Sequence, residues 1–482
     1  MSPGLHHTLH SRYNPQKEAE KYFTSLDLPA GIRFFILIEP GREYLIPPLY
    51  RRFPLAKIIA LHLEAPRIPT AAQEILVRRW SPEQGIPLQT FLEQEIPDTL
   101  AAAIRIIEWR PALAAYREGY RRILEETVNF IKRIDANMRT TCAFGRRWFR
   151  NFFKNLRLIR RVLVQDPAAA SIPVIVTAAG PSLETAIPLI KDLQRQSPHL
   201  ILAVSSSVQA LRGRGIVPDL VITTDGGGWA CFHLYECLRG IDPQAPLVLA
   251  VSLSAALPSQ CEGLVLLPIS DGSLWQQQIL QSLGIPYISL PQRGTVSASA
   301  LDLALRLTQG KIYLTGMDLA HKDIRTHARP YSFDRLIEAK ASRLNPGYAQ
   351  HFTRSKAILD GGSHAIYAAW FNQHVQAYPE RLFTLGSNNP VFNALNPRIL
   401  QDQPEQPLVL GVQTIPWQDD PVEQAATLLL KALSNPSIGA RIQEELRSLL
   451  ALEEPGQTQC AETLSTQILK LIEPYRKKRK NG

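Results

Sequence analysis

Short apolar runs separated by polar or glycine-containing turns recur through the middle of the chain. Their high content of Val, Ile and Leu predicts buried strands. The predicted strands are Val174–Thr177, Leu200–Val204, Leu220–Thr224, Leu247–Ser252, Leu264–Leu267, Tyr287–Leu290 and Ile312–Leu314. Helical patterns lie between several of these strands, and repeated strand–helix–strand units are typical of a parallel sheet with helices on both faces. We therefore expect an α/β fold with a central, doubly wound, mostly parallel sheet that is Rossmann-like.

The residues before this region predict a smaller α/β domain. Phe34–Ile38 and Lys57–Leu61 have the pattern of strands, with a short helix over Leu45–Tyr50 between them. A long helical stretch is expected from about residue 100 to residue 163. Glu39 follows the first strand, but no Gly-x-Gly-x-x-Gly motif precedes it. We interpret Glu39 as a structural residue.

Beyond about Asn396 the apolar spacing becomes helical, notably through Ala425–Leu433 and Ile442–Leu452. We therefore predict three parts: an N-terminal α/β domain with long helices over residues 1–140, a central domain over 141–395, and a helical C-terminal region over 396–482. The expected role of the last region is packing, oligomerisation or partner binding.

The composition indicates a soluble globular protein, since 45% of the 482 residues are hydrophobic and 20% are charged. No apolar stretch has the length of a membrane span, and Met1–Asp27 lacks the apolar core of a secretory signal. We expect a cytoplasmic protein. The five cysteines form no Cys-x-x-Cys pair, which favours reduced thiols over a disulfide framework or a zinc site.

The formal net charge of +10 suits an acidic partner, although charge alone does not say which one. Eight basic residues and no acidic one lie between Arg139 and Arg161, and their spacing predicts an amphipathic helix. Such a helix either docks on a neighbouring domain or binds a membrane or an acidic partner.

Polar residues follow the ends of the predicted strands, where ligands bind in open α/β sheets. The turn Gly180-Pro181-Ser182 leads from a strand into a helix. Gly180 allows a close backbone approach, Ser182 can cap the helix, and the first amides of the helix attract an anion. The turn therefore predicts phosphate or nucleotide binding, and its alternative is an ordinary strand-to-helix connection. The candidate binding residues are Gly180, Pro181, Ser182, Leu183, Ser205, Ser206, Asp225, Arg293, Gly294, Thr295 and Gly316.

The order of these motifs resembles the motility accessory factor (Maf) glycosyltransferases, whose core is an MptE-like (DUF115) domain. The residues that carry the resemblance are Gly180-Pro181-Ser182-Leu183, Gly215-Ile216-Val217-Pro218-Asp219, Thr224-Asp225, Gly294-Thr295-Val296, Gly316-Met317-Asp318-Leu319 and Thr326-His327-Ala328. It covers residues 145 to 395 and extends distantly to bacterial sialyltransferases that use CMP-activated sugars. The resemblance implies that residues 141–395 form a GT-A-like or Rossmann-like catalytic domain that binds a nucleotide sugar.

The same resemblance implies transfer of a nonulosonic, sialic-acid-like sugar from a CMP donor to Ser or Thr of flagellin or a related surface protein. No cofactor is required on this interpretation, although Mg²⁺ could assist. Nucleic acid is not expected as a partner, and the oligomeric state stays open.

The resemblance also implies catalytic roles for residues that match the family's motifs. A histidine is a suitable base for the acceptor hydroxyl near neutral pH. His327 matches the Maf pattern, whereas His364 lies nearer the position of the base in the sialyltransferases; each is alternatively a structural residue. Asp318 could orient a histidine or the sugar, or cap a turn. Arg293 could pair with a phosphate or carboxylate, and Tyr331 and Tyr367 are weaker phosphate-contact candidates.

Two positions depart from the family pattern. Ala178 stands where the family turn often begins with glycine, and Met317 replaces an amide in Gly-Gln-Asp-Leu. The alanine restricts the turn at the end where a phosphate would approach. The methionine removes an amide that could bind the ligand, which affects the identity of the donor.

Two other functions remain open. Archaeal pterin diphosphokinases share the Gly-Pro-Ser-Leu turn, and that activity would need ATP and Mg²⁺, with Asp219, Asp225 and Asp318 as the available carboxylates. A noncatalytic accessory protein would instead bind an acidic partner on the basic face from Arg147 to Arg161.

Overall fold

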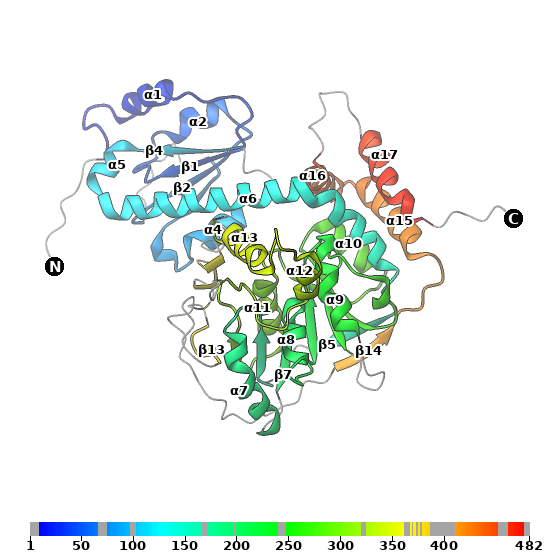
Figure 1. The fold of residues 1–482 in the computed structure, drawn as a ribbon. Helices are drawn as coiled ribbons and strands as arrows, with labels where there is room; N and C mark the ends of the chain where they lie inside the picture. The colour runs from blue at the N-terminus through cyan, green and yellow to red at the C-terminus, as the bar shows by residue number, and fades with distance from the viewer. Residues whose placement is uncertain are drawn as a thin grey trace. The chain divides into compact units, whose positions relative to one another are not determined.

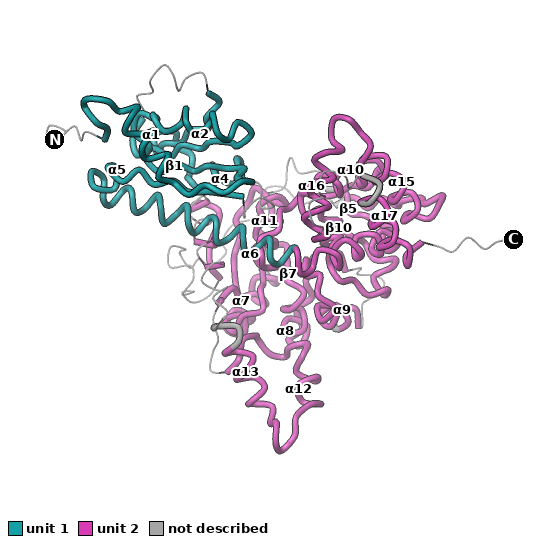
Figure 2. Tube along the Cα trace, turned by 90° about the horizontal axis from the view of Figure 1, so that it is seen from above, with its two compact units in different colours: residues 1–141 teal, residues 142–482 magenta. Residues whose placement is uncertain are grey.

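The computed structural model divides the chain into two compact units, residues 1–141 and 142–482 (Figure 2). The boundary falls within helix α6 (Arg117–Leu156). The residues that the structure describes are 9–65, 75–96, 103–165, 171–196, 199–239, 247–319, 324–360, 367–368, 370–372, 375, 378–385, 410–451 and 461–476.

The first unit is built on a parallel sheet in which the described strands lie in the order β3-β2-β1-β4, of which Figure 1 labels β2, β1 and β4. Its elements besides α6 are α1 (Pro15–Ser25), β1 (Phe34–Ile38), α2 (Ile46–Arg52), β2 (Lys57–Leu61), β3 (Val77–Trp80), α4 (Leu88–Glu95), β4 (Ile104–Glu108) and α5 (Arg110–Ala115). The predicted β1–α2–β2 unit is confirmed.

Strand β1 is apolar throughout because both faces of this sheet are covered. Phe34 and Ile36 belong to a core with α4 and the first part of α6, while Phe35 and Leu37 pack with α2 on the other face. Side chains alternate between the two faces of a strand, so a strand covered on both faces carries no polar position. The prediction of continuous helix from residue 100 to 163 is wrong at 104–108 and 161–165, which are strands β4 and β5. Such short apolar runs do not distinguish helix from strand by themselves, and pairing with β1 and β10 decides here.

The second unit contains the larger sheet. Its described strands follow the order β13-β12-β6-β7-β8-β9-β10-β5-β14, with β11 paired to β10. The strands are β5 (Arg161–Gln165), β6 (Val174–Thr177), β7 (Leu200–Val204), β8 (Leu220–Thr223), β9 (Val248–Ser252), β10 (Val265–Ser270), β11 (Ile288–Ser289), β12 (Ile312–Thr315), β13 (Leu382–Thr384) and β14 (Leu410–Thr414). The helices are α7 (Leu183–Gln196), α8 (Val208–Arg212), α9 (Cys231–Leu238), α10 (Leu274–Ser282), α11 (Val296–Leu307), α12 (Asp334–Lys340), α13 (Gly347–Asp360), α15 (Pro421–Leu433), α16 (Gly439–Leu449) and α17 (Ala461–Ile472).

The predicted doubly wound, mostly parallel sheet is confirmed. One face packs against α7 to α10 and the C-terminal helices, and the other packs against α11. All seven strands predicted for this region are present, with small differences at their ends. Among the described strands, β14 runs antiparallel, along β5 at the edge of the sheet.

The strand order reverses at β6. From β6 the chain proceeds through β7, β8, β9 and β10 in one direction, and β12 and β13 lie on its other side. In open α/β sheets the connections on either side of such a reversal diverge and leave a crevice at the carboxyl ends of the strands. The carboxyl ends of β6 and β12 are therefore the expected position of a ligand site.

The helical C-terminal region is confirmed, and it is part of the second unit. Helices α15 and α16 pack against α10. The Glu445 carboxylate on α16 also accepts the amide N–H groups of Leu274 and Trp275, at 3.1 and 3.2 Å, and so caps α10. Burial of one apolar face of these helices against α10 explains their helical spacing in the sequence.

The basic stretch at the end of α6 docks on its own unit. Phe152 is fully buried against Trp275, with ring centroids 4.7 Å apart. On the polar side, Arg157 forms an ion pair of 2.8 Å with Asp420, and Lys154 donates to a backbone carbonyl. These contacts dock the helix within its own unit, whereas the prediction placed it on a neighbouring domain or a partner. Among the described residues, no helix combines the length and the apolar character that crossing a membrane requires.

Candidate functional site

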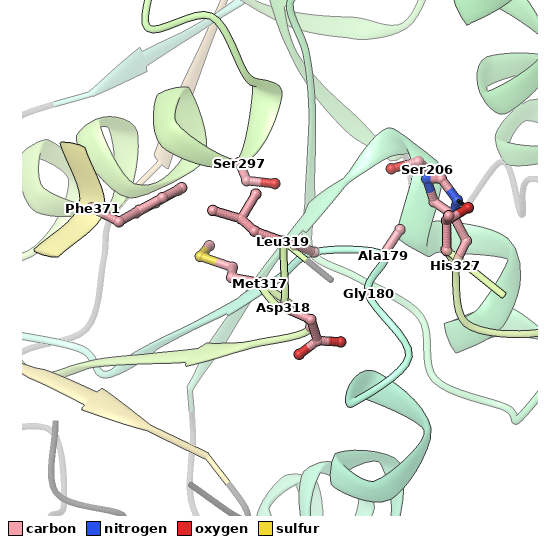
Figure 3. Close-up of a pocket in the computed structure, with 12 residues that line it drawn as sticks. Ala179, Gly180, Ser206, Ser297, Met317, Asp318, Leu319, His327 and Phe371 are labelled. Atoms are coloured by element: carbon pink, nitrogen blue, oxygen red, sulfur yellow. Dashed lines mark hydrogen bonds between the residues drawn. The ribbon is translucent and has the colours of Figure 1, made fainter. Parts of the chain in front are cut away.

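A cavity of about 140 Å³ lies at the carboxyl ends of β6, β7 and β12, where the strand order reverses (Figure 3). Its position follows from the topology, since open α/β sheets bind ligands at the carboxyl ends of the strands where the strand order reverses. The residues that line it are Ala178, Ala179, Gly180, Ser206, Ser297, Gly316, Met317, Asp318, Leu319, Thr326, His327 and Phe371.

Five of the predicted site residues come together in this cavity: Gly180, Ser206, Gly316, Asp318 and His327. They come from the ends of three different strands and from the segment that follows β12. The cavity therefore gathers motifs that are far apart in the sequence and meet at one edge of the sheet.

Other predicted residues lie outside the cavity lining. Ser205 is buried. Asp225 is exposed at the end of β8, and its Oδ1 accepts the Gly227 N–H at 2.7 Å, which makes a local turn. Asp225 therefore caps its own loop in this structure. His364 lies outside the described residues.

The turn Gly180-Pro181-Ser182 uses its amides inside the protein. The Ser182 N–H donates to Oδ2 of Asp318 at 2.7 Å, and the Gly180 N–H donates to the Gly316 carbonyl at 2.7 Å. The Leu183 N–H donates back to the Gly180 carbonyl at 3.0 Å. The anion at the start of α7 is thus the protein's own carboxylate, supplied from the end of β12. We predicted that a ligand phosphate binds at this turn. Such a phosphate would compete with Asp318 for the Ser182 N–H.

Glycine at position 180 serves this internal contact. A Cβ placed there would clash with Asp318 Oδ2 and with the Gly316 carbonyl. Gly316 itself has φ +70 and lies against the Ala178 carbonyl. The close approach that glycine allows therefore joins the loops after β6 and β12.

Asp318 is 8% exposed and has two different oxygen environments. Oδ2 caps α7, whereas Oδ1 is buried and has no hydrogen-bond partner among the described residues. Buried carboxylate oxygens are normally hydrogen-bonded, because desolvation without a partner is costly.

Thr326 and Tyr331 both contact the ring of His327. Its Nδ1 lies 2.7 Å from Oγ1 of Thr326, and its ring stacks on Tyr331 with centroids 4.2 Å apart. The Tyr331 hydroxyl accepts a hydrogen bond of 3.0 Å from Arg354, and burial raises the pKa of Tyr331 to about 12. Tyr331 therefore acts as an uncharged support for the His327 ring.

A second histidine packs on the same tyrosine but does not line the cavity. His233 Nδ1 lies 3.0 Å from the Ser332 hydroxyl, and its ring centroid is 5.5 Å from that of Tyr331. Burial, with a smaller contribution from the nearby Arg354, lowers the pKa of His233 to about 4. His233 is thus a neutral core residue near neutral pH.

The start of α11 borders the cavity through Ser297. Thr295 caps this helix, with its hydroxyl accepting the Ala298 N–H at 3.1 Å. Gly294 has φ +78, and a Cβ there would meet the Tyr367 ring. Arg293 donates from Nε to Asp302 at 2.8 Å and lies over the Trp370 ring, 5.3 Å from its centroid. Arg293, Gly294 and Thr295 thus form one local structure beside the cavity.

The three carboxylates considered for magnesium are not together. Asp219 precedes β8, and its Oδ2 accepts the Ile201 N–H at 2.7 Å near the amino end of β7. Asp318 lies at the opposite, carboxyl edge, and Asp225 is in an exposed turn. Among the described residues, no group of three or more His, Cys, Asp and Glu side chains could hold a metal ion.

The sequence-based reasoning did not find Phe371, and it named Thr326 in a motif without predicting its contact with His327. Ser297 directly follows the motif Gly294-Thr295-Val296, and Thr326 begins the motif that contains His327. No local pattern marks Phe371, which only the packing of its segment against α11 brings to the cavity.

Residues 146–323 match the family model described as 6-hydroxymethylpterin diphosphokinase MptE-like. This match confirms the MptE-like resemblance that the strand-end motifs predicted, and it includes the turn at Gly180 and the end of β12. His327 lies just beyond the matched residues.

Two further comparisons extend over more of the chain. An uncharacterized protein of Treponema pallidum (strain Nichols) is 31% identical over 307 residues, which are 63% of this chain and 64% of that relative. A similar solved structure is that of a MAf glycosyltransferase from Magnetospirillum magneticum AMB-1, with a TM-score of 0.45, 14% identity and coverage of 95% of this chain and 76% of that one.

Proposed function

We propose that this protein is a glycosyltransferase that moves a sugar from a nucleotide-sugar donor to a hydroxyl group of an acceptor. The observation that carries the proposal is the convergence of His327, Asp318 and Ser206 in one cavity at the strand reversal. The described lining includes no Lys or Arg. An imidazole, a carboxylate and hydroxyl groups suit a polyhydroxylated ligand and proton transfer better than they suit a triphosphate.

His327 is the base in this proposal. As the acceptor hydroxyl attacks the anomeric carbon, its proton passes to the imidazole. The bond between the anomeric carbon and the phosphate oxygen breaks, and the nucleotide leaves with the electron pair. The contact with Thr326 and the stacking on Tyr331 restrict the ring, which lowers the entropic cost of this geometry. His364 remains the alternative base.

The acidic group of the donor binds at the start of α11. Unlike α7, this helix is capped by a neutral hydroxyl, that of Thr295, so its dipole is not compensated by a carboxylate in the first turn. Arg293 stands one residue before Gly294, and its Nε pairs with Asp302 at 2.8 Å, so a donor anion would share the guanidinium with that carboxylate. Arg293, Gly294 and Thr295 therefore remain candidate donor-binding residues.

In its specific form the proposal names a CMP-activated nonulosonic acid as donor and Ser or Thr of flagellin or a related surface protein as acceptor. A cytoplasmic location belongs to the same proposal. These details rest on the family resemblance of the motifs. They predict binding without a metal, because a departing nucleoside monophosphate carries less charge than a diphosphate.

Nucleotide binding tests the proposal. Calorimetry with CMP, CDP, UDP and ATP, each with and without Mg²⁺, should show metal-independent preference for CMP. Transfer from CMP-N-acetylneuraminate to water or a Ser/Thr peptide then tests catalysis. We expect His327→Gln to lower kcat by about 100-fold or more with KM little changed. His364→Gln tests the alternative base, and His351→Gln is the control, because His351 pairs with Arg329 outside the cavity lining.

A second candidate is the activity in the description of the matched family, diphosphoryl transfer to a pterin. Its magnesium would need carboxylates close together, and the described Asp219, Asp225 and Asp318 are dispersed. Magnesium-dependent ATP binding in the same experiment, without CMP binding, would favour this activity. Binding of no nucleotide would favour an accessory protein, although Lys154 and Arg157 of the basic face already contact their own unit.

A further inference from the structure

Asp318 joins two parts of the second unit with only one of its oxygens. Oδ2 holds the Ser182 N–H at 2.7 Å, which fixes the start of α7 to the end of β12. This contact accounts for the position of the side chain and for glycine at position 180. It does not account for Oδ1, which is buried without a partner among the described residues.

The chemistry of Oδ1 defines what could pair with it. A carboxylate oxygen accepts hydrogen bonds and repels anions, so its partner is a hydroxyl or an N–H group and not a phosphate. Hydrogen bonds to charged groups contribute more than those between neutral groups, and an unmade one in a buried site is costly. A ligand that donates to Oδ1 would recover this cost on binding.

The position of Asp318 in the cavity indicates where the other parts of the ligand would lie. In Figure 3, Ser297 and Phe371 lie on one side, Ser206 and His327 lie on the other, and Asp318 lies between the two groups. The start of α11, with Thr295 and Arg293, is on the side of Ser297. An anion and a hydroxylated ring would therefore occupy different parts of the same cavity.

We propose that Oδ1 of Asp318 accepts a hydrogen bond from a hydroxyl or N–H group of the donor sugar, and that the sugar lies between the start of α11 and His327. This inference rests on the proposed function. It makes Asp318 the residue that recognises the sugar, and it places the acidic group of the donor toward α11. The nucleotide without its sugar does not use this contact.

The test compares CMP-N-acetylneuraminate with CMP, which lacks the sugar, on the full chain. Asp318→Asn keeps an oxygen that can accept the Ser182 N–H but removes the charge. We expect it to weaken binding of CMP-N-acetylneuraminate at least about tenfold and to change binding of CMP less than about twofold. The matched control is Glu445→Gln, which makes the same chemical change at the cap of α10, away from the cavity lining. The control should shift the unfolding temperature as Asp318→Asn does and leave both affinities unchanged.

Three results would overturn the inference while leaving the proposed function intact. Unchanged affinity for CMP-N-acetylneuraminate in Asp318→Asn would show that Asp318 is only a helix cap. Equal weakening for both ligands would place the contact on the nucleotide. Tighter binding would show that the carboxylate faces the acidic group. If the wild-type chain binds none of CMP, CMP-N-acetylneuraminate, CDP, UDP and ATP, the proposed function fails and this inference with it.

Discussion

The two sheets of this protein differ in the polar residues at the carboxyl ends of their strands. In the first unit, Glu39, Glu43 and His62 follow strands β1 and β2 and are almost completely buried. His62 lies 3.0 Å from Glu43, and Arg79 donates to both oxygens of Glu43 at 2.8 Å. In the second unit, polar groups at the equivalent edge line a cavity, and Asp318 keeps one oxygen without a partner among the described residues.

The comparison shows that polar residues at strand ends do not by themselves make a ligand site. In the first unit these residues neutralise one another, which matches the structural interpretation of Glu39. In the second, the loops after β6 and β12 meet at Gly180 and Gly316, and Oδ1 of Asp318 is left without a partner among the described residues. The two sheets differ in how completely their charges are paired. Mutations in each sheet can test this difference.

The largest expected effect is in the buried cluster of the first unit. Glu43→Ala removes the partner of Arg79 and His62 and should lower the free energy of unfolding by about 3–5 kcal/mol. The control, Glu20→Ala, breaks an exposed ion pair of 3.3 Å with Arg51 and should cost less than about 1 kcal/mol. Hydrogen exchange of the β1 and β2 amides measures both. Equal effects of the two variants would contradict the view that the cluster closes this edge.

The two units should respond to pH in opposite directions through their buried histidines. Burial lowers the pKa of His62, but its hydrogen bonds to Glu39 and Glu43 outweigh burial and raise the pKa above 6.5. The contribution of His62 to folding stability is complete below pH 6.5 and is lost as pH rises through the folded-state pKa. Burial lowers the pKa of His233 to about 4, so its contribution is complete above pH 6.5 and is lost as pH falls toward 4.

For His233 the difference between the folded and ordinary pKa corresponds to roughly 3 kcal/mol at most. Hydrogen exchange of β2 and α9 peptides between pH 4 and pH 9 measures the two responses separately. His62→Gln should reduce the loss of exchange protection that β2 shows at alkaline pH. His233→Gln should reduce the loss of exchange protection that α9 shows at acid pH. Parallel pH dependence of the two peptides in the wild-type chain would refute the assignment.

A smaller effect is expected where the loops of the second unit meet. Gly180→Ala places a methyl group against Asp318 and the Gly316 carbonyl and should cost about 1–3 kcal/mol. Gly228→Ala is the control, because nothing lies within 4 Å of a Cβ there and its backbone is not in the left-handed region. Urea unfolding compares the two. A neutral Gly180→Ala would mean that the loops do not need this close contact.

The smallest effect concerns the cap of α11. Thr295→Ala removes the hydroxyl that accepts the Ala298 N–H and should cost about 1 kcal/mol, whereas Thr295→Ser should be nearly neutral. Thermal unfolding measures stability, and CMP binding measured alongside shows whether the ligand needs the ordered start of this helix. Equal stability of the Ala and Ser variants would remove the cap as an explanation.

Much of the fold could be predicted from local pattern. Strand β7 (Leu200–Val204) is apolar throughout, and β6 (Val174–Thr177) is apolar except for its last residue, because both faces of the sheet are covered; this leaves a clear signal in a few consecutive residues. Edge strands carry a weaker signal, which is why β13 and β14 were not predicted. The MptE-like motifs were also visible, because each is a short segment with its own turn chemistry.

The sequence alone determined that polar residues follow the strands and that Gly180, Asp318 and His327 belong to one set of motifs. Only the tertiary structure decided which of them pair. The contact between Ser182 and Asp318 joins residues 136 positions apart, and it converts an expected anion site into a capped helix. The two glutamates and His62 likewise close one edge only because β1 and β2 are neighbours. Local spacing specifies elements because their period is local, whereas the pairing of buried charges depends on distances that only the folded chain sets.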